Sequence, residues 1–223
     1  MLSPKIMVAM VGGLILGAVG LGVAPGAGDD KGAERPRCPC VDPTPDRANI
    51  NPAKFCGEYG LHVCAFHIGR QDPALQVETH HYCTPLRDGV FQCTLFDRDR
   101  GNARLLGVEY VVSDDIYRSL PDEEKKLWHP HDYEIRNGLF TLPGVPGDCE
   151  KKLLNGLYKT WGKVWHTWPD PKADLPLGAP VLMWSATGPG QVRSDLIKAR
   201  DQRYHIDLDQ VRKERATILG IPQ

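Results

Sequence analysis

Three consecutive segments between residues 74 and 113 carry alternating apolar and polar residues or short apolar runs. They are "ALQVETHHYC", "GVFQCTLFD" and "ARLLGVEYVVS", and the turn-rich stretches "TPLRDG" and "RDRGN" separate them. Segments of this length and periodicity, bounded by Gly, Pro and Asp, are typical of β-strands. Because strands joined by short turns pair antiparallel, the pattern predicts a β-meander within a folded region that begins near Leu61.

A helical segment and a second hairpin are expected after the meander. "SDDIYRSLPDEEKKLW" opens with helix-capping residues, and Pro121 stands where a second helical turn would begin. "HDYEI" and "LFTLP" then flank the dipeptide Asn137-Gly138. Asn-Gly supplies the positive φ angles of a two-residue hairpin turn, so these flanking segments are predicted to be paired strands.

The C-terminal half alternates between helical and strand-like patterns. "DCEKKLLNGLYKTWG" has apolar residues at helical spacing, with Asp148 placed to cap the helix and Gly162 placed to end it. "KVWHTW" and "VLMWSA" predict buried strands, and the tail from Val192 to Leu219 has helical spacing broken near His205. We therefore predict an α+β fold, a single domain with a mostly antiparallel sheet (the β-meander plus the hairpin) and flanking helices.

The N-terminal residues differ in composition from the rest of the chain. Lys5 precedes an uncharged apolar run from Ile6 to Ala24, which is typical of a secretory signal peptide and also long enough to span a bilayer. We assign residues 1–27 to a signal peptide or membrane anchor, 28–60 to a Pro/Cys-rich tether and 61–223 to the folded domain. The protein is then expected to be exported: periplasmic, in the cell envelope or secreted, and free or membrane-anchored.

Composition narrows the class of protein. Hydrophobic residues make up 41% of the chain and charged residues 25%, which is ordinary for a globular protein. The net charge is −1 and the basic residues are scattered, so a nucleic-acid partner is not expected. The seven cysteines would permit disulfides in an exported chain, with one thiol left over, but their connectivity stays open.

The segment "LWHPHDYEI" offers two histidines one residue apart. On a strand, His129 and His131 would share one face about 6–7 Å apart, a spacing that suits two imidazoles converging on one divalent ion such as zinc. We expect both to face inward. His166, together with either Glu109 or Glu134, is predicted to complete the site.

The lengths of the meander turns predict a second polar cluster. They place His81, Gln92 and Glu109 in one row across three strands, about 5 Å apart from strand to strand. In this register Cys83 shares their face and Cys93 points to the other. A slip of one residue would reverse the faces.

Two accounts of these side chains remain open. In the first, a divalent transition metal such as zinc is bound by residues drawn from His81, Glu109, His129, His131, Glu134 and His166. In the second, the same residues form a hydrogen-bonded polar core. The sequence contains no nucleophile elbow, phosphate-binding loop, dinucleotide fingerprint or His-Glu-x-x-His helix, so it leaves open whether the protein is an enzyme.

Several phrases occur together in a recognisable order: "HVCAFH", "QVETHHYC", "LLGVEYVVS", "LPDEEKKLWHPHDYE", "PGVPG", "GKVWHTW" and "DLPLGAPVLM". From about Leu61 to Ala216 the chain resembles the oil-body-associated protein family, long catalogued as a domain of unknown function and found in plants, fungi and bacteria. The apolar N-terminal segment suggests an exported, bacterial-type member. The resemblance implies a membrane or lipid surface as a partner, and it supplies no catalytic or metal-binding residues. The alternative function is therefore a non-catalytic envelope or lipid-surface protein with a structural polar core.

Overall fold

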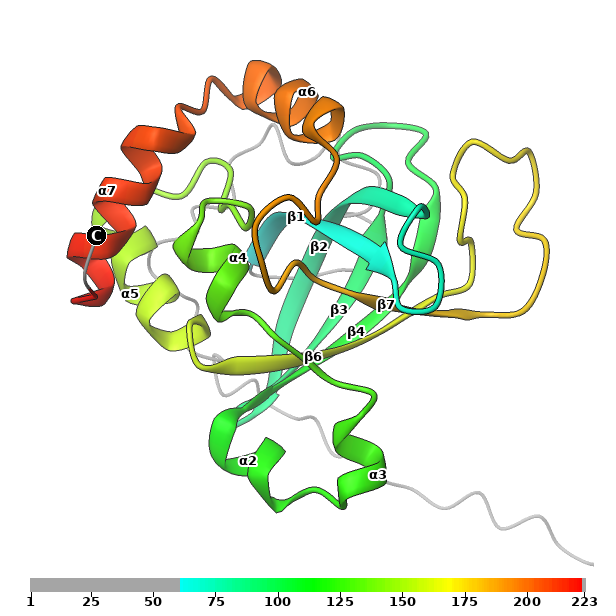
Figure 1. Ribbon diagram of the computed structural model, residues 1–223, viewed down its shortest axis with the longest axis horizontal. Helices are drawn as coiled ribbons and strands as arrows, with labels where there is room; N and C mark the ends of the chain where they lie inside the picture. The colour runs from blue at the N-terminus through cyan, green and yellow to red at the C-terminus, as the bar shows by residue number, and fades with distance from the viewer. Residues whose placement is uncertain (1–60, 222–223) are drawn as a thin grey trace, which may run out of the picture. The chain divides into compact units, whose positions relative to one another are not determined.

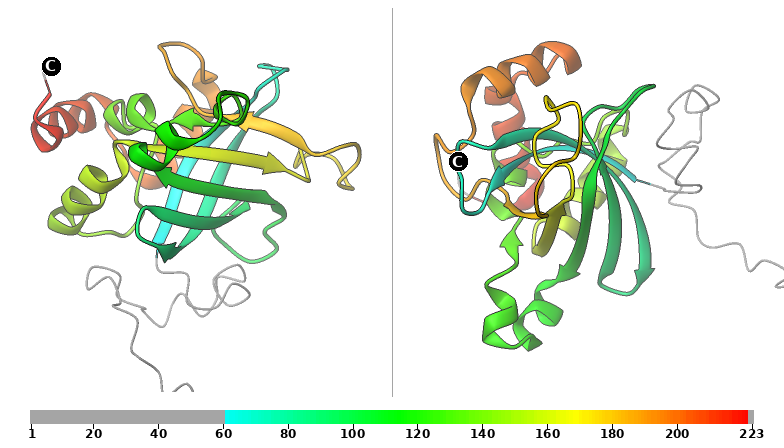
Figure 2. Two further views of the ribbon diagram at one scale, coloured as in Figure 1. Left: turned by 90° about the horizontal axis from the view of Figure 1, so that it is seen from below. Right: turned by 90° about the vertical axis from the view of Figure 1, so that its right-hand side faces the viewer.

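The computed structural model describes residues 61–221. The predicted signal peptide or anchor, the tether and three of the cysteines (Cys38, Cys40 and Cys56) lie outside the described residues. In the described part, six antiparallel strands close into a barrel (Figures 1 and 2). They are β1 (Leu61–Gly69), β2 (Gln76–Arg87), β3 (Val90–Phe96), β4 (Leu105–Ser113), β6 (Thr160–His166) and β7 (Val181–Trp184).

Pairing between distant strands closes the barrel. The strand order is β4-β3-β2-β1-β7-β6, and β6 pairs back with β4 from Gly107 opposite His166 to Ser113 opposite Thr160. A two-residue strand, β5 (His129–Pro130), pairs with the first half of β6, and β7 pairs with the second half of β6 on the same side. The predicted α+β class and the antiparallel pairing of β2, β3 and β4 in a meander are thus confirmed. The sheet as a whole is a closed barrel rather than an open meander, and this closure was not predicted.

The helices lie outside the barrel. They are α2 (Asp114–Ser119), α3 (Asp122–Lys125), α4 (Asp132–Arg136), α5 (Gly147–Leu157), α6 (Ser194–Tyr204) and α7 (Leu208–Leu219). Helices α5, α6 and α7 lie on one side of the barrel, whereas α2 and α3 lie at one end (Figure 1). The predicted helical break is found at His205, which has a left-handed backbone. None of the helices in residues 61–221 is long and apolar enough to cross a bilayer.

The predicted second hairpin is wrong, because residues 132–136 form helix α4. Gly138 does adopt a positive φ of 70°, but it follows the end of a helix, the other common place for that conformation. The Leu139 amide then donates to the Glu134 carbonyl at 2.9 Å instead of to a strand. The fully buried Arg200 of α6 donates to the Gly138 and Leu139 carbonyls at 3.0 and 3.3 Å. This contact fixes the turn that follows α4.

Helix α5 is shorter than predicted. It ends at Leu157, and Gly162, expected to end the helix, lies within strand β6. Two clusters of apolar core residues, both with members that face the barrel interior, explain the arrangement. Inside the barrel, Leu95, Val164 and Met183 are fully buried, while Leu154 of α5 packs in a second cluster with residues of β1 and α4. Burying a side chain of this size stabilises the fold by about 1.5–3 kcal/mol.

The strand register differs from the predicted one at both turns. His81 lies opposite Leu95, three residues beyond the predicted Gln92. Glu109 lies opposite Cys93, one residue from the predicted partner, after a bulge at Leu95 and Phe96. Each error is an odd number of residues and so moves a side chain to the opposite face of the sheet. The two changes of face cancel, and His81 and Glu109 share the inner face as predicted. Gln92 does not lie between them, since it pairs with Thr84 and Tyr110 on the outer face.

The same shift corrects the prediction for Cys93. This residue faces the barrel interior, opposite Cys83, and the two sulfurs form a disulfide. Cys64, which is buried, is the free cysteine among the described residues. The Cys83–Cys93 disulfide, which joins the paired strands β2 and β3, therefore lies beside the histidines in the barrel interior.

Candidate metal centre

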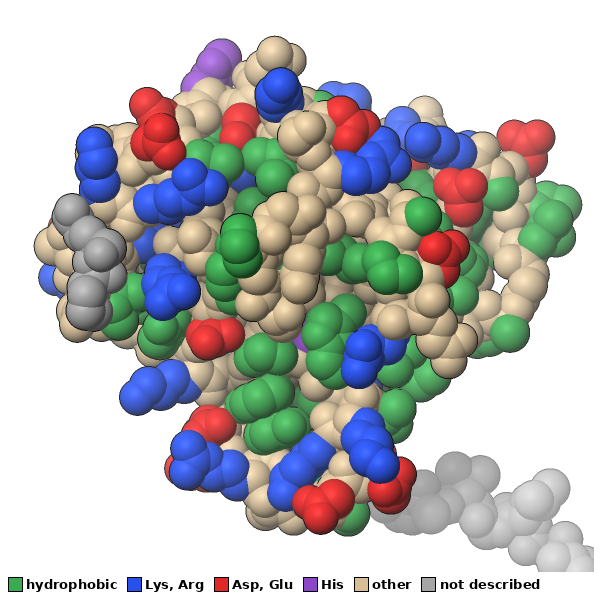
Figure 3. All heavy atoms as spheres, in the orientation of Figure 1, with side chains coloured by type: hydrophobic (Ala, Val, Ile, Leu, Met, Phe, Trp, Pro, Cys, Tyr) green, Lys and Arg blue, Asp and Glu red, His purple; other side chains and the backbone are tan. Residues whose placement is uncertain are grey.

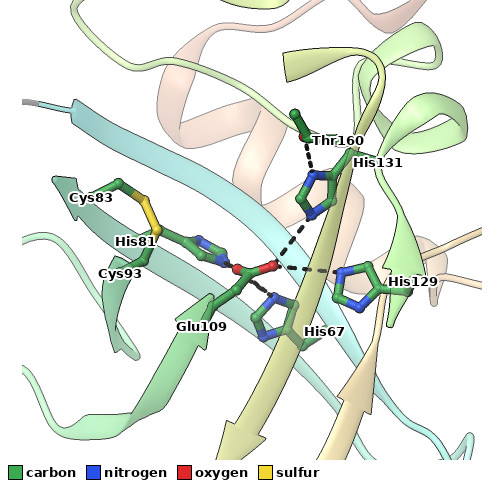
Figure 4. The surroundings of a disulfide bond; sticks show 8 residues. All are labelled: His67, His81, Cys83, Cys93, Glu109, His129, His131 and Thr160. Atoms are coloured by element: carbon green, nitrogen blue, oxygen red, sulfur yellow. Dashed lines mark hydrogen bonds and ion pairs between the residues drawn. A yellow bond between two sulfur atoms is a disulfide. The ribbon is translucent and has the colours of Figure 1, made fainter. Parts of the chain in front are cut away.

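Glu109 of β4 projects into the barrel and is surrounded by imidazole rings (Figure 4). Only 3% of Glu109 is exposed. Its Oε2 lies 2.9 Å from His81 Nε2 and 3.9 Å from His67 Nε2. Its Oε1 lies 3.2 Å from His131 Nε2 and 3.6 Å from His129 Nε2. Four imidazoles thus direct the same type of nitrogen at one carboxylate.

Four different elements deliver these rings. Inward-facing positions of β1 and β2 supply His67 and His81, which lie 3.1 Å apart between their Nε2 atoms. His129 belongs to β5, and its pairing opposite Gly162 turns it into the barrel. His131 is not a strand residue as predicted, since it has helical backbone angles and precedes α4. The inward direction predicted for both His129 and His131 matches the structure, although the extended geometry is wrong.

Gly162 leaves the space that the cluster fills. A Cβ atom at this position would overlap the Glu109 carboxylate and lie 2.6 Å from His131 Nε2 and 2.9 Å from His129 Nε2. Real Cβ contacts essentially never come this close. A strand glycine often marks the close approach of another group. Here the approaching groups are the candidate ligands themselves.

A second layer of polar groups orients two of the rings. His67 Nδ1 lies 2.9 Å from His166 Nε2. His131 Nδ1 lies 2.8 Å from Thr160 Oγ1, and this hydroxyl donates to the Leu157 carbonyl at 2.6 Å. Because the hydroxyl proton is used in that bond, Thr160 accepts from His131 Nδ1, and the Nε2 of a neutral His131 carries a lone pair.

Burial lowers the pKa of three of the imidazoles in and beside the cluster. It lowers the pKa of His129 and of His166 to about 3. Burial, followed by the proximity of His81 and His166, lowers the pKa of His67 well below its usual range. Burial opposes ionisation of Glu109, but interactions with His131 and His81 outweigh it and hold the pKa of this carboxyl well below its usual range. Neutral imidazoles and an ionised carboxylate are the forms that bind metals.

The ligand atoms fall into two groups of three that share Glu109. One group contains His67 and His81, and the other contains His129 and His131, with the atoms of each group within 4.8 Å of one another. Two ligands at tetrahedral angles, each about 2.0–2.1 Å from zinc, are about 3.4 Å apart. The observed contacts of 2.9–3.9 Å to Glu109 are close to this spacing.

Two of the predicted ligands lie outside these groups. His166 stands behind His67, where it orients that ring. Glu134, on α4, is buried and lines the cavity beside His131. Burial, together with the Glu109 and Asp132 carboxylates, raises its pKa well above the usual range.

Sequence reasoning missed His67. It lies on β1, which was not predicted as a strand although "LHVCAFHIG" alternates in the way that a strand does. Counting by twos from Leu61 places Val63, Ala65 and His67 on one face. That alternation was the available signal.

The part of the chain that the structure describes also contains buried nitrogens without a hydrogen-bond partner. They are the Nδ1 atoms of His81, His129 and His166. A buried polar group left unpaired costs about 1–3 kcal/mol. These three rings are therefore held in place by packing and by their Nε2 contacts rather than by a hydrogen bond at Nδ1.

The chain is similar to several plant proteins. Oil body-associated protein 1B of Arabidopsis thaliana is 42% identical over 71% of this chain and 66% of its own length. Oil body-associated proteins 2A and 1A of Zea mays are 47% and 42% identical over 70% and 71% of this chain, and over 64% and 67% of their own lengths. The chain thus spans about two thirds of the length of these relatives.

These relatives correct the predicted location. The expectation of an exported protein, periplasmic, in the cell envelope or secreted, is wrong, because the matching proteins are oil body-associated proteins of plants and not exported bacterial proteins. Its basis, the apolar segment of residues 6–24, lies outside the described residues.

The family assignment rests on most of the folded region. No solved structure gives a significant match. A family model described as "Protein of unknown function (DUF1264)" matches residues 54–219, which include the whole barrel and every residue of the cluster around Glu109. Together with the identities above, this match shows that the chain belongs to the oil body-associated protein family.

Proposed function

We propose that the barrel binds a divalent transition metal in the cluster around Glu109. The observation that carries this proposal is the convergence of four imidazole Nε2 atoms on the two oxygens of one buried carboxylate. His131 Nε2 faces Glu109 Oε1 at 3.2 Å, and its Nδ1 is turned to Thr160. Both facing atoms are therefore placed to bind one cation.

The donor set favours a metal of intermediate softness. Imidazole nitrogens suit zinc, copper, iron and nickel, and a carboxylate extends the range towards manganese. Glu109 acts as the shared oxygen ligand. His166 and Thr160 orient the rings of His67 and His131 from behind, as outer partners do in metal sites.

The competing account is a polar core without a metal. In that account, His81 and His131 donate hydrogen bonds to Glu109. The Nδ1 atoms of His81, His129 and His166 lack partners in both accounts, and both accounts need the space that Gly162 leaves. What favours the metal is the convergence of four Nε2 atoms on one carboxylate.

Thermal unfolding with added metal separates the two accounts. Chelator-treated protein should gain stability on addition of zinc, manganese or iron(II), because a ligand that binds only the folded state raises its melting temperature. His131→Ala should abolish the gain, whereas His205→Asn, which changes an exposed histidine outside the cluster, should retain it. Unchanged melting temperatures with all three metals would exclude the metal site.

We also propose that the protein contacts a lipid surface. The relatives are named for association with oil bodies, and the loop of residues 167–180 projects from the barrel with hydrophobic side chains exposed on it (Figure 3). Leu175 is 60% and Leu177 is 72% exposed. Two neighbouring exposed leucines can enter the boundary between lipid headgroups and acyl chains.

Flotation with phospholipid-coated triacylglycerol droplets tests this contact. The wild-type protein should float with the droplets, and the double variant Leu175→Ser/Leu177→Ser should remain in the aqueous fraction. Leu86→Ser is the matched control, because it changes an exposed leucine near the end of strand β2. Equal flotation of the double variant and wild type would show that this loop is not the contact.

A further inference from the structure

A small cavity adjoins the cluster inside the barrel. It has a volume of about 20 Å³, and His67, His81 and Glu109 line it together with His131. A cavity of this size holds about one water molecule. One complete group of three candidate ligands therefore faces an empty space large enough for one more donor atom.

Apart from Glu134, the remaining walls of the cavity are apolar. Val63, Phe91, Val111 and the Cys83–Cys93 disulfide contribute to them. Elsewhere in the barrel, Leu95, Val164 and Met183 are fully buried core residues. The half-buried Leu61 and Phe91 mark the side on which the cavity approaches the surface of the described region.

We propose that this cavity is an open coordination position of the metal ion, and that it takes one small exogenous donor, a water molecule that an anion of the size of azide can replace. The inference rests on the proposed metal site and adds what that site does. Catalytic zinc sites have three protein ligands and an open fourth position, whereas structural sites are closed by four protein ligands. His67, His81 and Glu109 supply three ligands beside the cavity.

The apolar walls determine which ligands fit. Apart from Glu134, they offer no hydrogen-bonding side chain that would hold a larger polar molecule, and the volume excludes ligands much larger than a few atoms. The low-dielectric surroundings also strengthen the attraction between the metal and an anionic donor. A small anion that binds the metal directly should therefore enter, whereas a bulky anion should not.

Cobalt(II) is the probe for this position, because its visible absorption responds to a change of ligand. Titration of the cobalt-loaded full chain with azide should change the spectrum in a saturable manner. Val111→Phe places a larger side chain in the cavity and should weaken azide binding at least tenfold while cobalt content stays at the wild-type level. Val108→Phe is the control, because Val108 is exposed on the outer face of the same strand and should leave azide binding unchanged.

The outcomes separate this inference from the metal site itself. Cobalt uptake without any azide-dependent change would overturn the open position and leave the metal site standing. Azide binding that Val111→Phe leaves unchanged would place the ligand elsewhere and would also overturn it. If Val111→Phe does not fold, Val111→Ile provides the same comparison with a smaller reduction in azide affinity. Absence of cobalt uptake would refute the proposed metal site as well.

Discussion

Replacing Gly162 with alanine is the change most closely tied to the geometry of the cluster. The added Cβ would overlap the Glu109 carboxylate and lie 2.6 Å from His131 Nε2. Both residues are at least 96% buried, so neither can move into solvent. Overpacking of this kind costs about 1–3 kcal/mol. The lower backbone entropy of alanine in a strand offsets at most about 0.5–1 kcal/mol of this cost.

Gly162→Ala should therefore reduce stability and metal binding together. A loss of 1 kcal/mol lowers the melting temperature of a domain of this size by about 2–4 °C, and displaced ligands should weaken metal affinity by about 10–100-fold. The control is Gly156→Ala in helix α5, where a Cβ would meet nothing within 4 Å and should stabilise the helix slightly. Calorimetry of chelator-treated and metal-loaded protein measures both effects. Wild-type stability and affinity in Gly162→Ala would refute the reasoning.

Three further predictions concern the surroundings of the cluster. Thr160→Val should cost about 1–3 kcal/mol in urea unfolding and weaken metal binding, and an unchanged affinity would show that Thr160 does not orient its imidazole. Loss of the Cys83–Cys93 disulfide through paired serine substitutions should cost about 2–4 kcal/mol, which an unchanged urea midpoint would contradict. In chelator-treated protein, His129 and His166 have a pKa of about 3 in the folded state against an ordinary value of 6.5. Between pH 3 and 6.5 the unfolded state therefore binds more protons than the folded state. Stability should then rise from pH 3 to 6.5, and a flat profile would contradict neutral burial.

The prediction of which side chains lie close together was more accurate than the prediction of the backbone elements that carry them. His81 and Glu109 were correctly placed on one face because the two register errors, of three residues and one residue, cancelled in parity. The identity of the facing residues depended on the first turn, which lies at Asp88-Gly89 between the paired Arg87 and Val90 rather than across the whole of "TPLRDG". It also depended on bulges next to Pro85 and Phe96. The disulfide was missed for the same reason.

Other errors arose where one local signal serves two structures. Asn137-Gly138 fits a hairpin turn and the end of a helix equally well. The residue that packs closely over Gly138, Val211 of α7, is distant in the sequence, so no local pattern could distinguish the two structures. Closure of the barrel depends on pairing between β4 and β6, which are separated by about fifty residues. Gly162 was interpreted as a helix end because its function, leaving space for Glu109, appears only in three dimensions.

Elemental analysis of the purified full chain tests the central claim most directly. Protein purified without chelators should contain a transition metal at a stoichiometry of at least one per chain. Glu109→Gln, which keeps the size of the side chain but removes its charge, should lose that metal. Glu123→Gln, which changes an exposed glutamate on α3, should retain it. Wild-type protein without a transition metal, and unable to take one up from zinc, manganese or iron(II) solutions, would contradict the account and leave the histidines as a structural core.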